Sequence, residues 1–289
     1  MAMELPDQCT ASPPWSSSAL KRLSWSLRDG LPAPPDCPHY QDVLIWYDDL
    51  ARAVSQHLGR IDWTRTASGL DDVQITFRAK TIDTLREKLQ RTPAISLGYV
   101  QDVAGVRIEA DISTVTQDAI ARAVVAMFGQ DDSAIRDYRA DAHSGYRAVH
   151  VWLRFPAGRV EVQIRTRLQG QWANTFEAMA DFVGRDVRYG VLPSDPDQRG
   201  LVAALIDISV TDLSELEGSG NDVTVLLDQL EDFRESVVSG ISSEEEGLAL
   251  LDELEPRVTA LRDSYRGRAE GYHHLLVNLE NSFRSARGQ

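Results

Sequence analysis

The stretch from Arg159 to Thr166 constrains this chain more than any other, because its apolar and polar residues alternate strictly. An alternation of period two predicts a β-strand with two different faces. One face is aliphatic and the other holds an acid, an amide and a cation: Val160, Val162 and Ile164 against Glu161, Gln163 and Arg165. Such a polar face suits a site for a metal-bound, phosphorylated substrate. An ordinary strand with a solvated outer face is the alternative interpretation.

Similar patterns predict the elements around this strand. Alternating residues predict three further strands, over 73–77, 100–109 and 147–155. The turn Pro156–Gly158 predicts a hairpin between the last of these and the Arg159 strand. Apolar residues at helical spacing predict helices over 40–58, 81–90 and 115–128 and from 168 onward. The stripe expected in the first of these helices is Val43, Ile45, Trp46, Leu50 and Val54. Residues 135–146 are polar and irregular, which favours a binding loop.

Three parts are expected along the chain. Residues 1–38 form a lead-in with one helix, capped near Ser16 and ending at Arg28. Residues 39–190 form the central domain, and residues 191–289 form an acidic helical extension. The extension is expected to contain four helical segments, over 201–216, 225–238, 247–261 and 266–283.

The net charge of −14 is unevenly distributed. Residues 193–289 hold 20 acids and 8 arginines, a balance of −12, whereas residues 136–167 hold 7 arginines and 3 acids, a local +4. A basic pocket in an acidic protein suits a small polyanion better than long nucleic acid bound without specificity. The basic helix face with Lys21, Arg22 and Arg28 is interpreted as solvated, with an RNA contact as the alternative.

Membrane and secretory classes are not indicated. No apolar run approaches the roughly 20 residues of a membrane-spanning helix. Only two cysteines occur, Cys9 and Cys37, and their spacing is not that of a metal site. The expected location is cytoplasmic.

Two further clusters point to phosphate chemistry. Lysine is rare, yet Lys80 and Lys88 fall close together. Arg78 and Lys80 follow a predicted strand and precede a predicted helix, and Lys88 lies near the end of that helix. Cations at such a corner can bind phosphate. Asp102, beside Gly105, could hold a hard cation with little crowding. Each cluster alone also fits ordinary surface residues.

Five short motifs, taken in order, resemble the synthetase domain of the RelA/SpoT family over roughly residues 71–172. They are Arg78–Lys80, Asp102–Arg107, Asp137–Tyr138, Gly145–His150 and Glu161–Thr166. The resemblance implies an α+β fold: a mixed sheet of about five strands flanked by helices, similar to nucleotidyltransferases, with N-terminal helices and an α-helical C-terminal extension.

The resemblance also implies an activity, the transfer of the β,γ-pyrophosphate of ATP to a ribose 3′-hydroxyl. Asp102 and Glu161 would hold Mg²⁺, and Glu161 would also take the hydroxyl proton. Tyr146 would stack on the acceptor base. The residues implied on the ATP side are Arg78, Lys80, Lys88 and Arg107. Those implied on the acceptor side are Tyr146, His150, Gln163, Arg165, Arg136 and Arg139.

The chain departs from the family pattern in three ways. Asp141–Ala142 stands where a Pro-Lys pair is common, and Phe176 and Glu177 stand where an acid and a His usually follow Trp-Ala. No adjacent His-Asp pair of a hydrolase half occurs. GDP or GTP is the expected acceptor. The alternative is a toxin that modifies the tRNA 3′ end or makes an adenosine alarmone and is neutralised by an antitoxin. A non-catalytic nucleotide-binding module is a third reading, and a homo-oligomer is left open.

Overall fold

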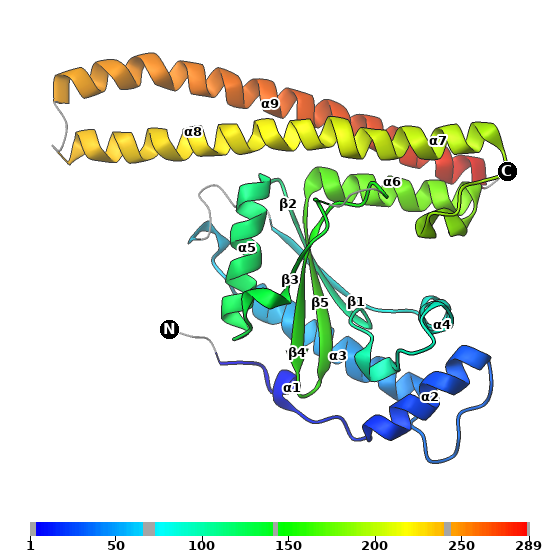
Figure 1. The fold of residues 1–289 in the computed structure, drawn as a ribbon. Coiled ribbons are helices and arrows are strands. Elements are labelled where there is room, and N and C mark those ends of the chain that lie inside the picture. The colour runs from blue at the N-terminus through cyan, green and yellow to red at the C-terminus, as the bar shows by residue number, and fades with distance from the viewer. Residues whose placement is uncertain (1–3, 66–72, 141–143, 240–243, 288–289) are drawn as a thin grey trace. The chain divides into compact units, whose positions relative to one another are not determined.

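In a computed structural model, the protein is described over residues 4–65, 73–140, 144–239 and 244–287 (Figure 1). The strands are β1 (Gln74–Ala79), β2 (Ala104–Ala110), β3 (Ile135–Asp137), β4 (Val149–Phe155) and β5 (Gly158–Thr166). The helices are α1 (Asp7–Thr10), α2 (Ser17–Asp29), α3 (Tyr40–Leu58), α4 (Ile82–Arg91), α5 (Thr114–Met127), α6 (Arg167–Val183), α7 (Pro196–Asp207), α8 (Ser214–Val238) and α9 (Glu244–Arg287). A π-helical segment, η5 (Ile208–Leu213), joins α7 to α8.

The chain divides into two compact units that do not follow chain order. The sheet unit comprises Met1–Ala110, Asp118–Tyr138 and Ala148–Arg165. The helical unit comprises Asp111–Gln117, Arg139–Arg147 and Thr166–Gln289.

Five strands of the sheet unit lie in the order β1-β2-β5-β4-β3. The pairs β1/β2, β3/β4 and β4/β5 are antiparallel, and Phe155 pairs with Gly158 at the tip of the predicted hairpin. The expected α+β fold, a mixed sheet of five strands with flanking helices, is confirmed. Among the described residues, no helix is both long and apolar enough to cross a membrane.

The two faces of the sheet differ as the alternation in β5 predicts. Val160, Val162 and Ile164 are fully buried, and α3 packs against β1 and β2. The ring of Tyr47 in α3 approaches Gly158 so closely that a Cβ there would lie 2.8 Å from it. The opposite face of β5 carries the acid, the amide and the cation, so the polar residues are gathered on one side.

Three expectations for the sheet unit need correction. The strand predicted from residue 100 begins at Ala104, and Asp102 lies in the turn before it. The predicted loop 135–146 begins with β3, because its first three residues pair with β4. The expected stripe of α3 is wrong at Ile45, which is 60% exposed, while Tyr47 is 3% exposed. Steps of four and three residues connect Val43, Tyr47 and Leu50, and residue 45 falls outside that stripe.

The helical extension contains fewer breaks than predicted. α8 continues through Gly218 and Gly220, and α9 continues through Pro256. A Cβ on Gly220 would lie 2.9 Å from the ring of Tyr265, so this glycine allows α9 to approach closely. Packing between α8 and α9, which run side by side in Figure 1, outweighs the local preferences of Gly and Pro. The segments predicted as separate helices are therefore joined.

A cluster of buried hydrophobic residues lies in the helical unit. It is built mainly from α6, α7, α8 and α9, and Trp172 and Phe176 of α6 stack at 5.0 Å between ring centroids. A capping box begins α6: the Thr166 hydroxyl accepts from the backbone N–H of Gln169, and the Gln169 side chain accepts from the backbone N–H of Thr166. These two bonds stabilise the first turn of α6.

Candidate functional site

A cavity of about 150 Å³ opens on the polar face of the sheet unit. Its lining comes from β1, β2, β5 and the turns beside them: Thr76, Phe77, Arg78, Lys80, Asp102, Gly105, Val106, Arg107, Glu161 and Gln163. Six of the residues predicted as site residues therefore share one cavity. Two carboxylates and three cations line it, which is the composition expected for binding phosphate with a cation.

Asp102 is held between two lysines at one end of the cavity. Lys80 Nζ donates to Asp102 Oδ2 at 2.6 Å, and Lys88 Nζ donates to Oδ1 at 2.7 Å. Burial raises the pKa of Asp102, but the charges and hydrogen bonds of the two lysines outweigh it, so the net pKa is lowered. The carboxylate is therefore ionised at neutral pH.

The turn that carries Asp102 is anchored to neighbouring strands. Gln101 Nε2 donates to the carbonyls of Val160 at 2.9 Å and Leu153 at 3.3 Å. The backbone N–H of Lys80 donates to the carbonyl of Val103 at 2.9 Å. Because these bonds fix the backbone on both sides, Asp102 and Lys80 meet without belonging to a strand.

Glu161 is 8% exposed and lies within reach of three side chains. Gln163 Nε2 donates to its Oε2 at 2.8 Å, Trp152 Nε1 donates to its Oε1 at 3.2 Å, and His150 Nδ1 lies 3.2 Å from Oε1. Burial raises the pKa of Glu161, contacts with His150 and Gln163 lower it, and the charge of Asp102 raises it; the net pKa is lowered. Glu161 is thus an ionised, nearly buried carboxylate, and the charge of Asp102 contributes to its pKa.

Arg165 continues this row of hydrogen bonds along β5. Its Nη2 donates to Gln163 Oε1 at 3.0 Å, and the side chain is buried. Glu109 of β2 lies near Arg107 and Arg165, and burial raises its pKa although both arginines lower it. The polar face therefore combines a cation-rich end with an ordered row of an acid, an amide and a guanidinium.

Trp152 is a site residue that the sequence reasoning missed. It pairs with Glu161 across the β4/β5 hairpin, and the Arg136 guanidinium lies 4.7 Å from its ring centroid. Arg136 also donates to the carbonyls of Ser133 and Ile135. The tight turn fixes the hairpin register, so counting back from it could have placed Trp152 opposite Glu161.

Two predicted acceptor residues belong to the helical unit. Tyr146 is half-buried and packs against its core. Arg139 donates to the carbonyl of Thr114 at 3.1 Å and to Gln117 Oε1 at 3.0 Å. These contacts place both residues in the packing of their own unit. Asp141 and Ala142, which depart from the family pattern, lie outside the described residues.

The donor set for a metal is limited to two carboxylates. Among the residues that the structure describes, no group of three or more His, Cys, Asp and Glu side chains could hold a metal ion. Asp102 and Glu161 line the same cavity, however, and both are ionised. Mg²⁺ is commonly bound by one or two carboxylates together with substrate phosphates and water, so the residues present fit that ion.

Comparison with known proteins gives a match over the region that holds the cavity. Residues 77–183 match the family model described as the region found in RelA / SpoT proteins. Similar curated relatives are the uncharacterized protein Mb1401 of Mycobacterium bovis and the uncharacterized protein Rv1366 of Mycobacterium tuberculosis. Each is 49% identical over 181 residues, 63% of this chain and 64% of the relative. The chain thus matches less than two thirds of their length.

Solved structures with some likeness include small alarmone synthetase 1 from Bacillus subtilis bound to its product pppGpp. It is 23% identical with a TM-score of 0.42, covering 62% of this chain and 96% of that one. A GTP pyrophosphokinase family protein from Streptococcus pneumoniae is 21% identical with a TM-score of 0.45, covering 64% of this chain and 94% of that one.

Proposed function

We propose that the chain is a nucleotide pyrophosphokinase of the RelA/SpoT family, whose model residues 77–183 match, as the motifs predict. It transfers the β,γ-pyrophosphate of ATP to the 3′-hydroxyl of GDP or GTP. The observation that carries the proposal is the shared cavity of Asp102 and Glu161, two ionised carboxylates facing Arg78, Lys80 and Arg107.

The triphosphate of ATP binds at the cation-rich end. Arg78 and Arg107 face the cavity from paired strands, since Thr76 and Arg78 of β1 lie opposite Arg107 and Gly105 of β2. The ammonium groups of Lys80 and Lys88 form ion pairs with Asp102. In the proposal they bind phosphate oxygens instead when nucleotide binds. Charge neutralisation and positioning are the main requirements of phosphoryl-type transfer.

Asp102 and Glu161 would hold Mg²⁺ together with the ATP phosphates. The ion would supply neutralisation of the charge that develops on the phosphates. Loss of the Lys80 and Lys88 contacts to Asp102 on nucleotide binding leaves that carboxylate available to a cation.

Glu161 accepts the proton of the attacking hydroxyl. The 3′-oxygen forms a bond to the β-phosphorus, the bond between the β-phosphorus and the oxygen bridging to the α-phosphate breaks, and AMP leaves. Gln163 and Trp152 hold the two carboxylate oxygens in place, which favours one orientation of the base. The lowered pKa keeps Glu161 ionised and ready to accept.

The acceptor lies beyond Glu161, along the remaining residues of the polar face. His150, Gln163, Arg165 and Arg136 are the sheet-unit residues proposed for this side. Tyr146 and Arg139 belong to the helical unit, and the family resemblance alone assigns them to the acceptor. A nucleoside diphosphate or triphosphate supplies the anion that the arginines bind.

GDP or GTP is preferred to the tRNA 3′ end because the basic N-terminal helix is partly neutralised. Arg22 pairs with Asp36, Arg28 pairs with Asp29, and Lys21 lies 5.5 Å from the Trp25 ring centroid. These contacts favour the solvated interpretation of that face over an RNA contact.

The test is a transfer assay with γ-labelled ATP and Mg²⁺. The acceptors are GDP, GTP, AMP, ADP and deacylated tRNA, each incubated separately with the full chain. GDP or GTP should gain label, and E161Q should lower that transfer by about 10²–10⁴-fold, the usual worth of a general base. E177Q, which neutralises an exposed acid of α6, is the matched control and should retain activity. Labelling of tRNA alone, or full activity in E161Q, would contradict the proposal.

A further inference from the structure

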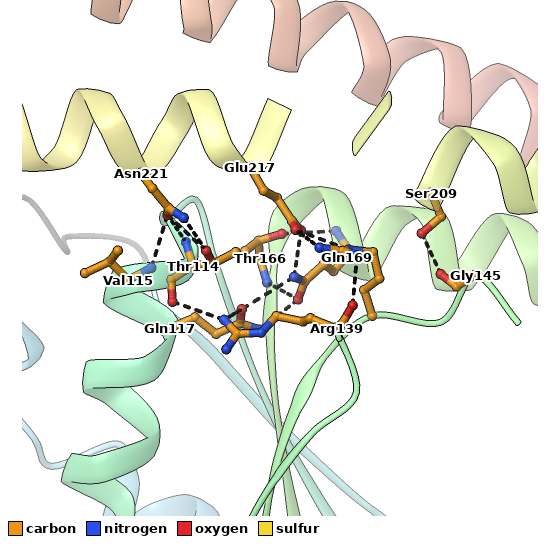
Figure 2. Close-up of polar contacts among 11 residues, drawn as sticks. Thr114, Val115, Gln117, Arg139, Gly145, Thr166, Gln169, Ser209, Glu217 and Asn221 are labelled. Atoms are coloured by element: carbon orange, nitrogen blue, oxygen red, sulfur yellow. Dashed lines mark hydrogen bonds and ion pairs between the residues drawn. The ribbon is translucent and has the colours of Figure 1, made fainter. Parts of the chain in front are cut away.

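The helical unit holds three consecutive residues, Gly145, Tyr146 and Arg147, through several of its helices. Figure 2 shows the polar contacts of this region. Tyr146 is the residue that the proposed function assigns to the acceptor base. Two of the polar contacts on either side of it, from Ser209 and Glu217, come from segments beyond residue 191, whose role the sequence did not reveal.

Two features constrain Gly145: a hydrogen bond to its carbonyl and the close approach of a tryptophan ring to its Cα. Ser209 Oγ of η5 donates to the Gly145 carbonyl at 2.5 Å, and Ser209 is 1% exposed. Gly145 has φ +78°, and a Cβ there would lie 2.5 Å from the Trp172 ring of α6. Only a glycine allows this backbone to adopt that φ so close to the indole.

Arg147 is fixed by an ion pair to α8. Its Nε donates to Glu217 Oε2 at 3.1 Å, and its Nη2 donates to the same oxygen. Arg147 is 9% exposed and Glu217 is 8% exposed, so water screens the pair little. Between these two anchors, Tyr146 packs against the hydrophobic core of the helical unit.

Glu217 also connects this tripeptide to the end of β5. Gln169 Nε2 donates to Glu217 Oε1 at 2.7 Å, and Gln169 Oε1 accepts from the backbone N–H of Thr166 at 3.2 Å. Arg147 Nη1 donates to the Arg139 carbonyl at 3.1 Å. Both carboxylate oxygens of Glu217 are therefore used, and one buried side chain joins α8 to two predicted site segments (Figure 2).

We infer that Glu217 and Ser209 are positioning residues that hold Tyr146 for the acceptor nucleotide. The inference rests on the proposed function, because it takes Tyr146 as part of the acceptor site. It assigns a role to the acidic helical extension: η5 and α8 order the Gly145–Arg147 backbone from both sides. Neither residue need touch the substrate.

Two variants test this in the full chain, E217Q and the milder S209A. E217Q leaves the Arg147 guanidinium buried without its charge partner, and S209A removes only the hydrogen bond to Gly145. The KM for GDP or GTP should rise by about tenfold or more in E217Q and by a smaller factor in S209A, while the KM for ATP stays within about twofold. Amide hydrogen exchange should become faster in a peptide covering residues 144–149 and remain unchanged over residues 74–79.

E215Q is the matched control, because it removes the same charge from an exposed position of the same helix. E217D should restore part of the acceptor affinity, since it keeps the charge on a shorter side chain. Equal rises in both KM values, faster exchange over both peptides, or wild-type behaviour in E217Q and S209A would overturn the inference. A wild-type protein that labels no acceptor would refute the proposed function instead, and exchange over 144–149 would still decide whether Glu217 orders the tripeptide.

Discussion

Replacing Asp102 by asparagine should destabilise the protein measurably. Asp102 accepts hydrogen bonds from two ammonium groups at 2.6 and 2.7 Å, and the three side chains are 20–29% exposed. A hydrogen bond to a charged group contributes about 1.5–3 kcal/mol when it is well buried. Screening by water at this exposure reduces each contribution, so D102N should lower the free energy of unfolding by about 2 kcal/mol.

The measurement is urea unfolding at neutral pH, where a lower midpoint at an unchanged slope reports the lost stability. D83N is the matched control, because Asp83 is 79% exposed and its oxygen lies 3.7 Å from Arg86. That exposed pair should contribute about 0.5 kcal/mol or less. In the double variant D102N/K88M, one of the two ammonium groups left without a carboxylate is also removed, so part of the lost free energy of unfolding should be recovered. Equal midpoints for D102N and D83N would refute the electrostatic reasoning.

The difference in free energy of unfolding between wild type and D102N should depend on pH in a predictable direction. The pKa of Asp102 is lowered on folding, because the two lysines outweigh the effect of burial. A lowered pKa contributes stability above the unfolded value, here 3.8, and that stability is lost as pH falls through the folded pKa. The difference between wild type and D102N should therefore be constant at neutral pH and shrink in acid.

Two further predictions concern single positions. H150Q should move the acid limb of the kcat/KM profile to higher pH, because burial raises the pKa of Glu161 and His150 is the main group that lowers it. An unchanged limb in a pH-rate series would count against that contact. G145A should cost at least about 1–3 kcal/mol in urea unfolding, since it combines φ +78° with a Cβ 2.5 Å from the Trp172 ring. G129A is its control, with φ +60° but nothing within 4 Å of the added Cβ, and it should cost less.

The residues of β5 were predictable from sequence because a half-buried strand has a strict period of two. Glu161, Gln163 and Arg165 lie on one face of the sheet for that reason alone. Asp102 is different, since the pattern predicted a strand where the chain makes a turn held by the Gln101 side chain. The motif predicted that Asp102 belongs to the site. The turn itself could not be predicted, because the hydrogen bond from Gln101 to Val160 joins residues 59 positions apart and leaves no pattern in the local sequence.

The role of Glu217 shows the same limit more strongly. The sequence from residue 193 onward contains 20 acidic residues, and no periodicity distinguishes the buried Glu217 from the others. The pairing of Glu217 with Arg147 spans 70 residues. Helix breaks were also predicted wrongly in this region, because Gly and Pro preferences act locally while contacts between α8 and α9 act over the whole helix length. Tertiary packing therefore determines both the helix boundaries of this segment and which of its acidic residues is paired with Arg147.

The two carboxylates of the cavity have partners of different kinds, and this difference favours different tasks. Asp102 accepts from two ammonium groups, so a proton on Asp102 would leave two cations without their partner. Glu161 accepts from an amide and an indole beside an imidazole, so a proton on Glu161 leaves no ammonium group unmatched. The cost of protonation is thus lower at Glu161, which suits a base that must take a proton during each turnover. Asp102 is better suited to releasing Lys80 and Lys88 to the phosphates of a bound nucleotide, because phosphate oxygens can replace its carboxylate oxygens as partners of the ammonium groups. Under the proposed function, the donor nucleotide would bind to the cations around Asp102, and Glu161 would remove the acceptor proton.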